Sequence, residues 1–270
     1  MNAEILFLGT GGDSIVVGKQ LRASGGIIIR VDDNQFHIDP GPGAVVQAIG
    51  RGVNPRENTA VLVTHNHINH CNDANAVIEA MTFGGIDKIG VLVSNKTVYN
   101  GTEELPAYLT NFHKGCVEKS LAIESGQRLG INEIEILSTR AVHSDPNTIG
   151  LKFFTSKFTL SYTSDTQISQ DVMVQYRESD ILILNVQNPS GLKEHNHMNS
   201  DDAITFIKTA KPKLAIITHF GIKMLNADIL QETRRIQKET KVQVVAATDG
   251  MSIDPTNYSA NLRTKTLNLY

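Results

Sequence analysis

Three histidines lie within the stretch from Thr64 to His70, which reads Thr-His-Asn-His-Ile-Asn-His. This stretch directly follows the apolar run 60–63, whose length and β-branched content predict a buried strand. Neutral imidazole is the commonest metal ligand in proteins, and a His-x-His pair with a third histidine close behind can converge on a metal. His65, His67 and His70 are therefore candidate metal ligands, with a polar loop that happens to be rich in histidine as the alternative.

Three more candidate ligands are far apart in the sequence but share one structural position. Each follows a stretch with the pattern of a β-strand, at 131–138, 158–162 and 214–217: His143, Asp165 and His219. Side chains that follow strands can gather at one edge of stacked sheets, where loops distant in sequence assemble a metal site on a rigid scaffold. The pattern therefore predicts one metal region that both parts of the chain build together.

The elements between these residues alternate between strands and helices. They form two halves, roughly 1–140 and 141–255, followed by a polar tail at 256–270 without a clear pattern. No linker rich in proline, glycine or serine divides the chain, so we expect a single domain over 1–270. The tail could also serve as a strap between the subunits of a homodimer.

Two segments are irregular in pattern. Residues 95–130 are interrupted by Gly101, Pro106 and Gly115, and we expect loops with short helices that shape a pocket there. A glycine-rich turn at 9–13 follows the first predicted strand, but no amphipathic helix is expected after it, which argues against a dinucleotide-binding turn. We expect these glycines to let the backbone approach the site closely.

The composition is that of an ordinary globular protein, with 40% hydrophobic and 20% charged residues. The 25 Lys and Arg against 28 Asp and Glu leave a net charge of −3, which provides no general attraction to nucleic acid or anionic membranes. The two cysteines, Cys71 and Cys116, make no disulfide framework and suit a reducing compartment. No signal pattern is evident, and no apolar run approaches the roughly 20 residues that span a bilayer. We therefore expect a soluble, cytoplasmic protein with no membrane partner.

The histidine-rich stretch at 64–70, followed in order by His143, Asp165 and His219, resembles the motif series of the metallo-β-lactamase superfamily over essentially the whole chain. The resemblance implies an α/β fold, a four-layer αβ/βα sandwich of two mixed β-sheets with the helices outside. It also implies one or two bound Zn²⁺ ions, with Mn²⁺ or Fe²⁺ as alternatives.

The resemblance assigns ligands to each metal. The first metal is held by three histidines and the second by two: His65, His67 and His143, then His70 and His219. Asp165 bridges both metals, because a carboxylate can contact two cations, and imidazole ligands leave each zinc an open position for water.

One residue departs from the family's pattern. The motif usually reads His-x-His-x-Asp-His, and Asn69 stands where the aspartate is expected. A neutral amide cannot take a proton from an attacking water, although its carbonyl oxygen can bind a cation weakly. Asn69 is thus a candidate catalytic-site residue with a loosely held second metal, and a weakly active or non-enzymatic metal-binding protein is an alternative interpretation.

The loop 196–200 and the opening stretch 7–11 resemble the phosphodiesterase branch of the superfamily, which includes ribonuclease Z. In that branch the equivalent of His197 contacts the scissile phosphate and can protonate the leaving group, as suits an imidazole near neutral pH. A solvent-exposed loop histidine is the alternative for His197, and His195 is the expected bystander.

The length of one connection argues against a large RNA substrate. Ribonuclease Z enzymes generally carry a tRNA-gripping arm between the equivalents of His143 and Asp165, whereas only 21 residues separate them here. The hairpin predicted at 148–162 uses nearly all of these residues. We therefore expect a small molecule or short phosphodiester, and not tRNA, as the substrate.

The expected function is that of a zinc-dependent hydrolase of a phosphodiester or related phosphate ester. The expected mechanism is attack by a metal-bound hydroxide, with His197 assisting departure of the leaving group. Hydrolysis of a lactone, thioester or β-lactam on the same metals is the alternative. Asp39, at the end of a predicted strand, could either orient a metal-binding histidine or stabilise a turn.

Overall fold

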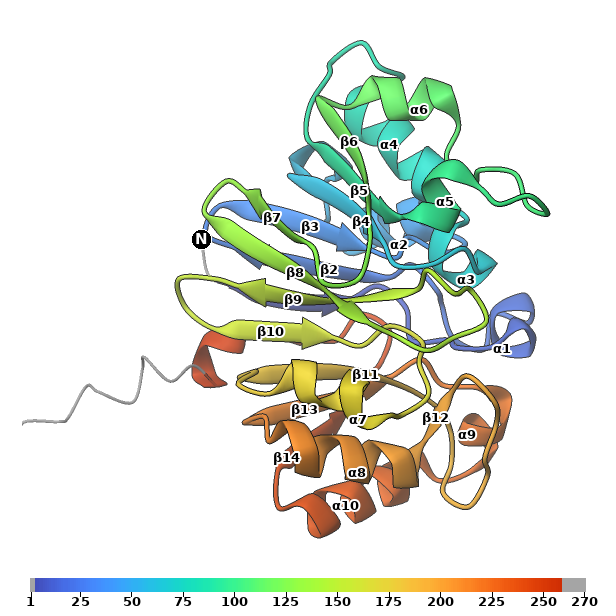
Figure 1. Ribbon diagram of the computed structural model, residues 1–270, viewed down its shortest axis with the longest axis vertical. Coiled ribbons are helices and arrows are strands. Elements are labelled where there is room, and N and C mark those ends of the chain that lie inside the picture. The colour runs from blue at the N-terminus through green and yellow to red at the C-terminus, as the bar shows by residue number, and fades with distance from the viewer. Residues whose placement is uncertain (1–2, 259–270) are drawn as a thin grey trace, which may run out of the picture.

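Two β-sheets pack face to face, with helices on the outer face of each (Figure 1). The computed structural model describes residues 3–258. Of the predicted polar tail, residues 256–258 belong to the short 3-10 helix η3 (Pro255–Tyr258). The rest of that tail, and with it the predicted dimer strap, lies outside the described residues.

The first sheet contains seven strands within residues 3–258, in the order β15-β1-β2-β3-β4-β5-β6. Pairing is antiparallel from β15 to β3 and parallel from β3 to β6. The strands are β1 (Glu4–Phe7), β2 (Ile27–Val31), β3 (Asn34–Ile38), β4 (Ala60–Val63), β5 (Val91–Asn95), β6 (Lys119–Ile123) and β15 (Ser252–Ile253). The carboxyl ends of β3, β4 and β5 therefore meet at one edge, and the histidine-rich stretch follows β4.

The second sheet has the order β14-β13-β11-β10-β9-β8-β7 in the described part of the chain, with β12 paired to β11. Strands β7 to β10 pair antiparallel, whereas β10, β11, β13 and β14 pair parallel. The strands are β7 (Arg128–Ile131), β8 (Ile134–Arg140), β9 (Ile149–Phe154), β10 (Thr159–Tyr162), β11 (Ile181–Asn188), β12 (Met198–Asn199), β13 (Leu214–Thr218) and β14 (Gln243–Ala246). Strands β10, β11 and β13 thus end at a common edge.

The helices occur between strands of both sheets. Those in the first part of the chain are α1 (Ser14–Gly18), α2 (Ala44–Gly50), η1 (Pro55–Glu57), α3 (Ile68–Cys71), α4 (Ala74–Thr82), α5 (Lys96–Asn100) and α6 (Asn111–Cys116). Those that follow are α7 (Gln170–Met173), η2 (Val174–Tyr176), α8 (Ser200–Ala210), α9 (Ile222–Asn226) and α10 (Ile229–Thr240). In α8 the side chain of Asn199 accepts from Asp202 N while the Asp202 carboxylate accepts from Asn199 N, a reciprocal cap that fixes where the helix begins.

Three apolar layers hold the elements together. The central layer lies between the sheets and joins Phe36 of β3 to Phe153 of β9, whose ring centroids are 5.4 Å apart. The second layer packs α8 and α10 on the second sheet, and the third packs α4 on the first sheet, for example through Val77. The layers therefore lie in the order helix, sheet, sheet, helix, which confirms the predicted four-layer αβ/βα sandwich.

The segment 95–130 differs from the prediction of loops with short helices. Besides α5 and α6 it contains the strands β6 and β7. Strand β7 pairs with β8, so 128–140 belong to the second sheet although the predicted boundary near 140 placed them in the first half. Strand β15 returns to the first sheet beside β1, which also crosses that boundary.

Two further findings concern the segment after the glycine-rich turn and the possibility of a membrane-spanning helix. A short helix, α1, follows the glycine-rich turn where only a loop was expected. Among residues 3–258, no helix has the length and apolar character needed to cross a membrane.

Candidate metal centre

The candidate ligands lie at the carboxyl ends of strands from both sheets. The first sheet supplies three of them after β4, and the second supplies the others after β8, β10 and β13: His65, His67, His70, His143, Asp165 and His219. The backbone φ is positive at Ser164 (56°) and at His219 (65°). Such values are uncommon for residues other than glycine and cluster at functional sites, where the surrounding structure maintains them.

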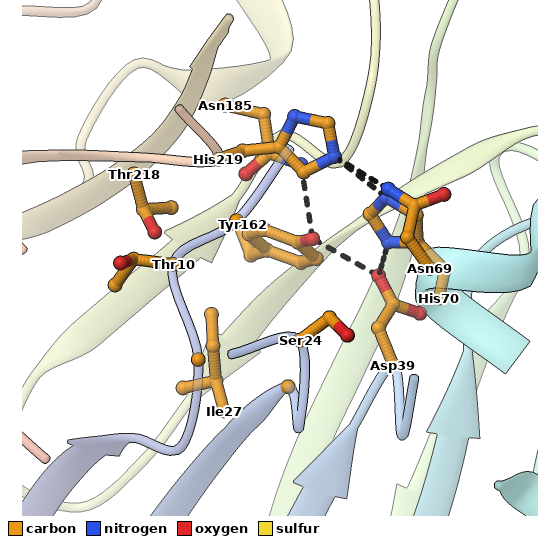
Figure 2. Close-up of a pocket in the computed structure, with 13 residues that line it drawn as sticks. Thr10, Ser24, Ile27, Asp39, Asn69, His70, Tyr162, Asn185, Thr218 and His219 are labelled. Carbon is orange, nitrogen blue, oxygen red and sulfur yellow. Dashed lines mark hydrogen bonds and ion pairs between the residues drawn. The ribbon is translucent and has the colours of Figure 1, made fainter. Parts of the chain in front are cut away.

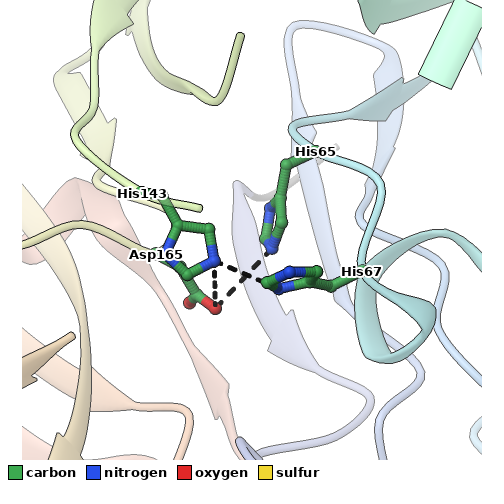
Figure 3. A group of neighbouring side chains, drawn as sticks. All are labelled: His65, His67, His143 and Asp165. Atoms are coloured by element: carbon green, nitrogen blue, oxygen red, sulfur yellow. Dashed lines mark hydrogen bonds and ion pairs between the residues drawn. The ribbon is translucent and has the colours of Figure 1, made fainter. Parts of the chain in front are cut away.

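Figure 3 shows the first group of ligands, in which His65, His67 and His143 surround the carboxylate of Asp165. His143 Nε2 lies 3.1 Å from His67 Nδ1 and 3.8 Å from Asp165 Oδ2. His65 Nε2 lies 3.6 Å from the same carboxylate oxygen. Ligand atoms around a tetrahedral zinc with bonds of about 2.0–2.2 Å are separated by about 3.3–3.6 Å, so this group has the spacing of a metal site.

The second group consists of His70, His219 and the same aspartate. His70 Nε2 lies 3.4 Å from Asp165 Oδ2, and His219 Nε2 lies 3.3 Å from Asp165 Oδ1. The two imidazole nitrogens are 2.9 Å apart. Asp165 thus stands between the two groups, as a bridging carboxylate would.

Two buried polar atoms indicate whether the cluster fits metal ions. His65 Nε2 and Asp165 Oδ2 have no hydrogen-bond partner among the described residues. A buried polar atom without a partner costs roughly 1–3 kcal/mol, and a cation between these atoms would remove that cost. The buried His/Asp cluster therefore fits a di-metal site. Imidazole donors suit zinc, copper, iron and nickel, so the donor set is compatible with several metals.

Burial determines the charge of most histidines in the cluster. Loss of solvation lowers the pKa of His67 to about 4 and the pKa of His219 to about 3. These imidazoles are therefore neutral at pH 7, which is the form that binds metals. Burial also opposes charge on His70, but the carboxylates of Asp165 and Asp39 outweigh it and raise the pKa of His70 to about 10. Protons and metal ions therefore compete for the imidazole of His70 in the second group.

Asp39 follows β3 and lies behind His70. Its carboxylate accepts hydrogen bonds from Thr64 N at 2.7 Å, Thr64 Oγ1 at 2.8 Å and the Tyr162 hydroxyl at 2.9 Å. His70 Nδ1 lies 2.9 Å from Asp39 Oδ2 and donates to it, which leaves Nε2 free to face Asp165. Of the two roles expected for Asp39, these contacts support the orientation of a histidine.

Asn185 is a site residue that the sequence analysis missed. Figure 2 shows it next to His219 and above Tyr162. Asn185 Nδ2 donates to Asp165 Oδ1 at 2.7 Å and to the Tyr162 hydroxyl at 3.1 Å. Since Tyr162 in turn donates to Asp39, one hydrogen-bonded chain joins the bridging carboxylate to the residue that orients His70. Its only signal in the sequence is a polar residue directly after an apolar strand.

Asn69 lies beside the second group, in α3. Its Nδ2 is 3.0 Å from His219 Nε2 and donates to Gly12 O at 3.0 Å. The amide therefore stands where a carboxylate ligand of a second metal would stand.

The structure places the two histidines of the loop 189–197, His195 and His197, in different surroundings. His197 Nδ1 lies 3.9 Å from Asp165 Oδ2, and its ring centroid is 4.9 Å from that of His143. The side chain of His197 is 18% exposed, so it faces both the cluster and the solvent. His195 is exposed at the surface of the loop. The contact between His143 Nδ1 and Asn196 O, 2.9 Å long, attaches this loop to the cluster.

Asp145, His37 and Gly12 have structural roles. Asp145 accepts from Asn95 Nδ2 and Thr97 Oγ1, at 2.8 and 2.7 Å, and so fastens the loop after β8 to the end of β5. His37 is buried, and its Nε2 lies 2.8 Å from Gly25 O. A Cβ at Gly12 would lie 2.2 Å from His219 O, so only glycine allows the opening turn to approach the loop that carries His219.

The chain matches a known family and a relative of unknown role. The model of the Beta-lactamase superfamily domain matches residues 34–220. The uncharacterized protein MJ1374 of Methanocaldococcus jannaschii is 31% identical over 259 residues, which are 95% of this chain and 97% of that protein.

Several solved structures share the fold. YhfI, a metallo-β-lactamase fold protein of Bacillus subtilis, has a TM-score of 0.77 and 16% identity, over 94% of this chain and 99% of that one. A diphosphatase of the PhnP family has a TM-score of 0.69 and 18% identity, over 94% and 97% of the two chains. The short form of human tRNase Z has a TM-score of 0.67 and 17% identity, over 93% and 98%. The family match, the fold and the buried His/Asp cluster together make this chain a member of the beta-lactamase superfamily, a metal-dependent hydrolase of the metallo-β-lactamase fold.

Proposed function

We propose that the protein is a phosphodiesterase that uses a pair of zinc ions to hydrolyse a short phosphodiester or related phosphate ester. The observation that carries this proposal is the position of His197, which faces the metal cluster from a loop without being part of either ligand group. The fold shared with a PhnP-family diphosphatase and with tRNase Z is consistent with phosphate-ester chemistry.

The residues of the cluster have separate roles in this proposal. His65, His67 and His143 would hold one ion and His70 and His219 the other, with Asp165 between the two groups. When bound, the metal ions would supply Lewis-acid activation of water and of the phosphoryl oxygen. Asp39 and Asn185 keep the ligands in place, because each accepts or donates a short hydrogen bond to a residue of the second group.

His197 acts on the leaving group. Its ring stacks 6.2 Å from the ring of His219 and is partly exposed, so a substrate bound over the cluster would lie next to it. An alkoxide that leaves a phosphodiester needs a proton, and a positioned imidazole can supply one.

The connection between the ligand loops favours a small substrate. The 21 residues between His143 and Asp165 contain β9 and β10 and a short turn, which leaves no room for a substrate-gripping arm. Together with the net charge of −3, this supports a short phosphodiester over tRNA.

A substrate panel tests the proposal. Purified protein would be stripped of metal, reloaded with Zn²⁺ or Mn²⁺, and assayed on bis-p-nitrophenyl phosphate, nitrocefin and a lactone. We expect metal-dependent hydrolysis of the phosphodiester and little turnover of the other two. Turnover of nitrocefin or the lactone alone would replace the phosphodiesterase by the alternative hydrolase, and no turnover of any substrate with bound metal would favour the non-enzymatic interpretation of Asn69.

A further inference from the structure

A pocket opens directly beside the metal centre, on the side of His67. It has a volume of about 660 Å³ and lies between the N-terminal end of α3, the loop that follows α5 and the loop at 144–146. In Figure 1 the loop after α5 projects from the same side of the molecule as α3. His67 belongs both to the first ligand group and to the wall of this pocket, so one substrate can contact the cluster and the pocket together.

The pocket wall combines carboxylates with apolar side chains. Glu103 and Glu104 are exposed on the loop after α5, and no Lys or Arg is among the residues that line the pocket. Ile68 and Leu105 are 56% and 48% exposed and offer apolar surface in the same wall. Exposed apolar side chains beside unneutralised carboxylates suit an organic cation better than they suit a polyanion.

Asp145 also lines the pocket but contributes little to it. Its carboxylate is buried and accepts hydrogen bonds from Asn95, Thr97 and the backbone of Asn147. The charge available to a ligand therefore comes from Glu103 and Glu104.

A second hollow, which borders His143 and shares Pro146 with this pocket, offers no compensating positive charge. It has a volume of about 410 Å³, beside His143, and Arg140 is its only Lys or Arg. The guanidinium of Arg140 pairs with Asp171 at 2.6 Å. A long nucleic-acid strand across the cluster would therefore meet two carboxylates and an arginine that is already paired.

We propose that the pocket beside His67 binds a cationic alkyl-ammonium group, so that the preferred substrates are phosphodiesters of amino alcohols. The proposal rests on the phosphodiesterase function proposed above. The phosphodiester lies at the metal centre, the alkyl part packs on Ile68 and Leu105, and the ammonium group lies near Glu103 and Glu104. Because exposed ion pairs contribute about 0.2–1 kcal/mol each, two of them correspond to a preference of roughly 2- to 30-fold.

Two substrates that differ only in charge test this inference. They are p-nitrophenyl phosphorylcholine and its neutral isostere, 3,3-dimethylbutyl p-nitrophenyl phosphate, which share the leaving group and the diester charge. We expect kcat/KM to favour the choline ester by roughly 2- to 30-fold at low salt. The preference should shrink when NaCl is raised, because exposed charges are screened.

Variants of the two glutamates locate the effect. The double variant Glu103→Gln/Glu104→Gln should hydrolyse both substrates at the rate of the neutral one. The variant Glu118→Gln removes an exposed carboxylate that does not line the pocket, and it should keep the preference. Calorimetric binding of phosphorylcholine and of 3,3-dimethylbutyl phosphate supplies a second readout that does not depend on turnover.

The outcomes distinguish this inference from the proposed function. Equal kcat/KM and equal binding for the charged and neutral compounds, with both substrates hydrolysed, would overturn the cation pocket and leave the phosphodiesterase intact. A preference that survives in the double variant would also overturn the cation pocket, because the protein would then recognise the ammonium charge at a different place. Failure to hydrolyse either substrate with metal bound would contradict both proposals.

Discussion

At the scale of single residues, the two histidines of the loop 189–197 provide a test variant and its control. His197 lies over the ligand groups, whereas His195, two positions earlier, is exposed to solvent. We expect His197→Ala to lower the turnover of a phosphodiester with an alkyl leaving group by about 10²–10⁴, the usual contribution of general acid catalysis. Steady-state kinetics, with bound metal counted in parallel, measure this effect.

The control for this prediction is His195→Ala, which should keep the turnover of the parent protein. The loss in His197→Ala should also be smaller for a p-nitrophenyl ester, because p-nitrophenolate departs without a proton. Equal loss with both leaving groups, or a loss of bound metal, would assign His197 to metal binding and not to proton transfer.

Asn69 gives the second prediction at this scale. Its amide lies 3.0 Å from His219 Nε2, where a carboxylate would add a negative ligand to the second group. We expect one equivalent of metal to leave the protein well before the other during a chelator titration, because two histidines hold it beside Asp165 whereas three hold the other. Asn69→Asp should tighten that weaker equivalent, as metal analysis at each chelator concentration would show.

Asn100→Asp adds the same charge at an exposed position outside the cluster and serves as the control. It should leave both metal affinities unchanged. If the two equivalents leave together and Asn69→Asp alters neither, then Asn69 does not occupy a ligand position.

The sequence indicated the candidate ligands and Asp39, but not the other residues that support them. His65, His67 and His70 are recognisable because histidines cluster after a strand, and Asp165 through its place in the motif series. Asn185 and Tyr162 had no such signal, since each is one of several polar residues in a buried strand, and its partners come from other strands and loops. Only the packing of the two sheets shows which polar groups they reach.

At the scale of elements, the buried strands were predictable, whereas two of the edge strands, β6 and β7, were not. Strand β4 and the hairpin of β2 and β3 match their predictions closely, because their residues form apolar runs separated by turn residues. Strands β6 and β7 lie at the edges of their sheets, and their partly exposed residues lack the apolar run of a buried strand. Strand β11 extends to Asn188 through buried polar residues, which made its end resemble a loop.

Asp39 provides a prediction about how elements are joined. Its carboxylate connects the end of β3 to Thr64 after β4, to Tyr162 of β10 and to His70 of α3. In Asp39→Asn the amide nitrogen cannot accept from His70 Nδ1, so the orientation of His70 is no longer maintained. We expect the affinity of the second metal to fall by about 10- to 100-fold, which a chelator titration would measure.

The same substitution should lower the free energy of unfolding by about 1–3 kcal/mol, because buried donors lose their acceptor. Urea unfolding of the metal-free protein measures this term separately from metal binding. The exposed Asp254→Asn is the control and should change neither quantity. Unchanged metal affinity in Asp39→Asn would reduce Asp39 to the turn-stabilising role.

At the scale of the whole molecule, the cluster of candidate metal ligands joins the two sheets. The ligands before position 71 follow a strand of the first sheet, and His143, Asp165 and His219 follow strands of the second. Without a cation, buried ligand atoms such as Asp165 Oδ2 lack partners. Metal binding should therefore be coupled to the packing of one sheet on the other.

Removal of metal should accordingly destabilise the entire fold and not only the loops. A ligand that binds only the native state stabilises it by about 2.7 kcal/mol at a hundred times its Kd, which for a protein of this size corresponds to a Tm change of about 5–10 °C. We expect a decrease in Tm of that order when a chelator is added, measured by calorimetry. His143→Ala should start from a lower Tm and respond little to chelator, because the first site has lost a ligand, whereas His195→Ala should respond like the parent protein. A Tm that chelator does not change, in a protein shown to have released its metal, would mean that the two sheets are held by their apolar layer alone.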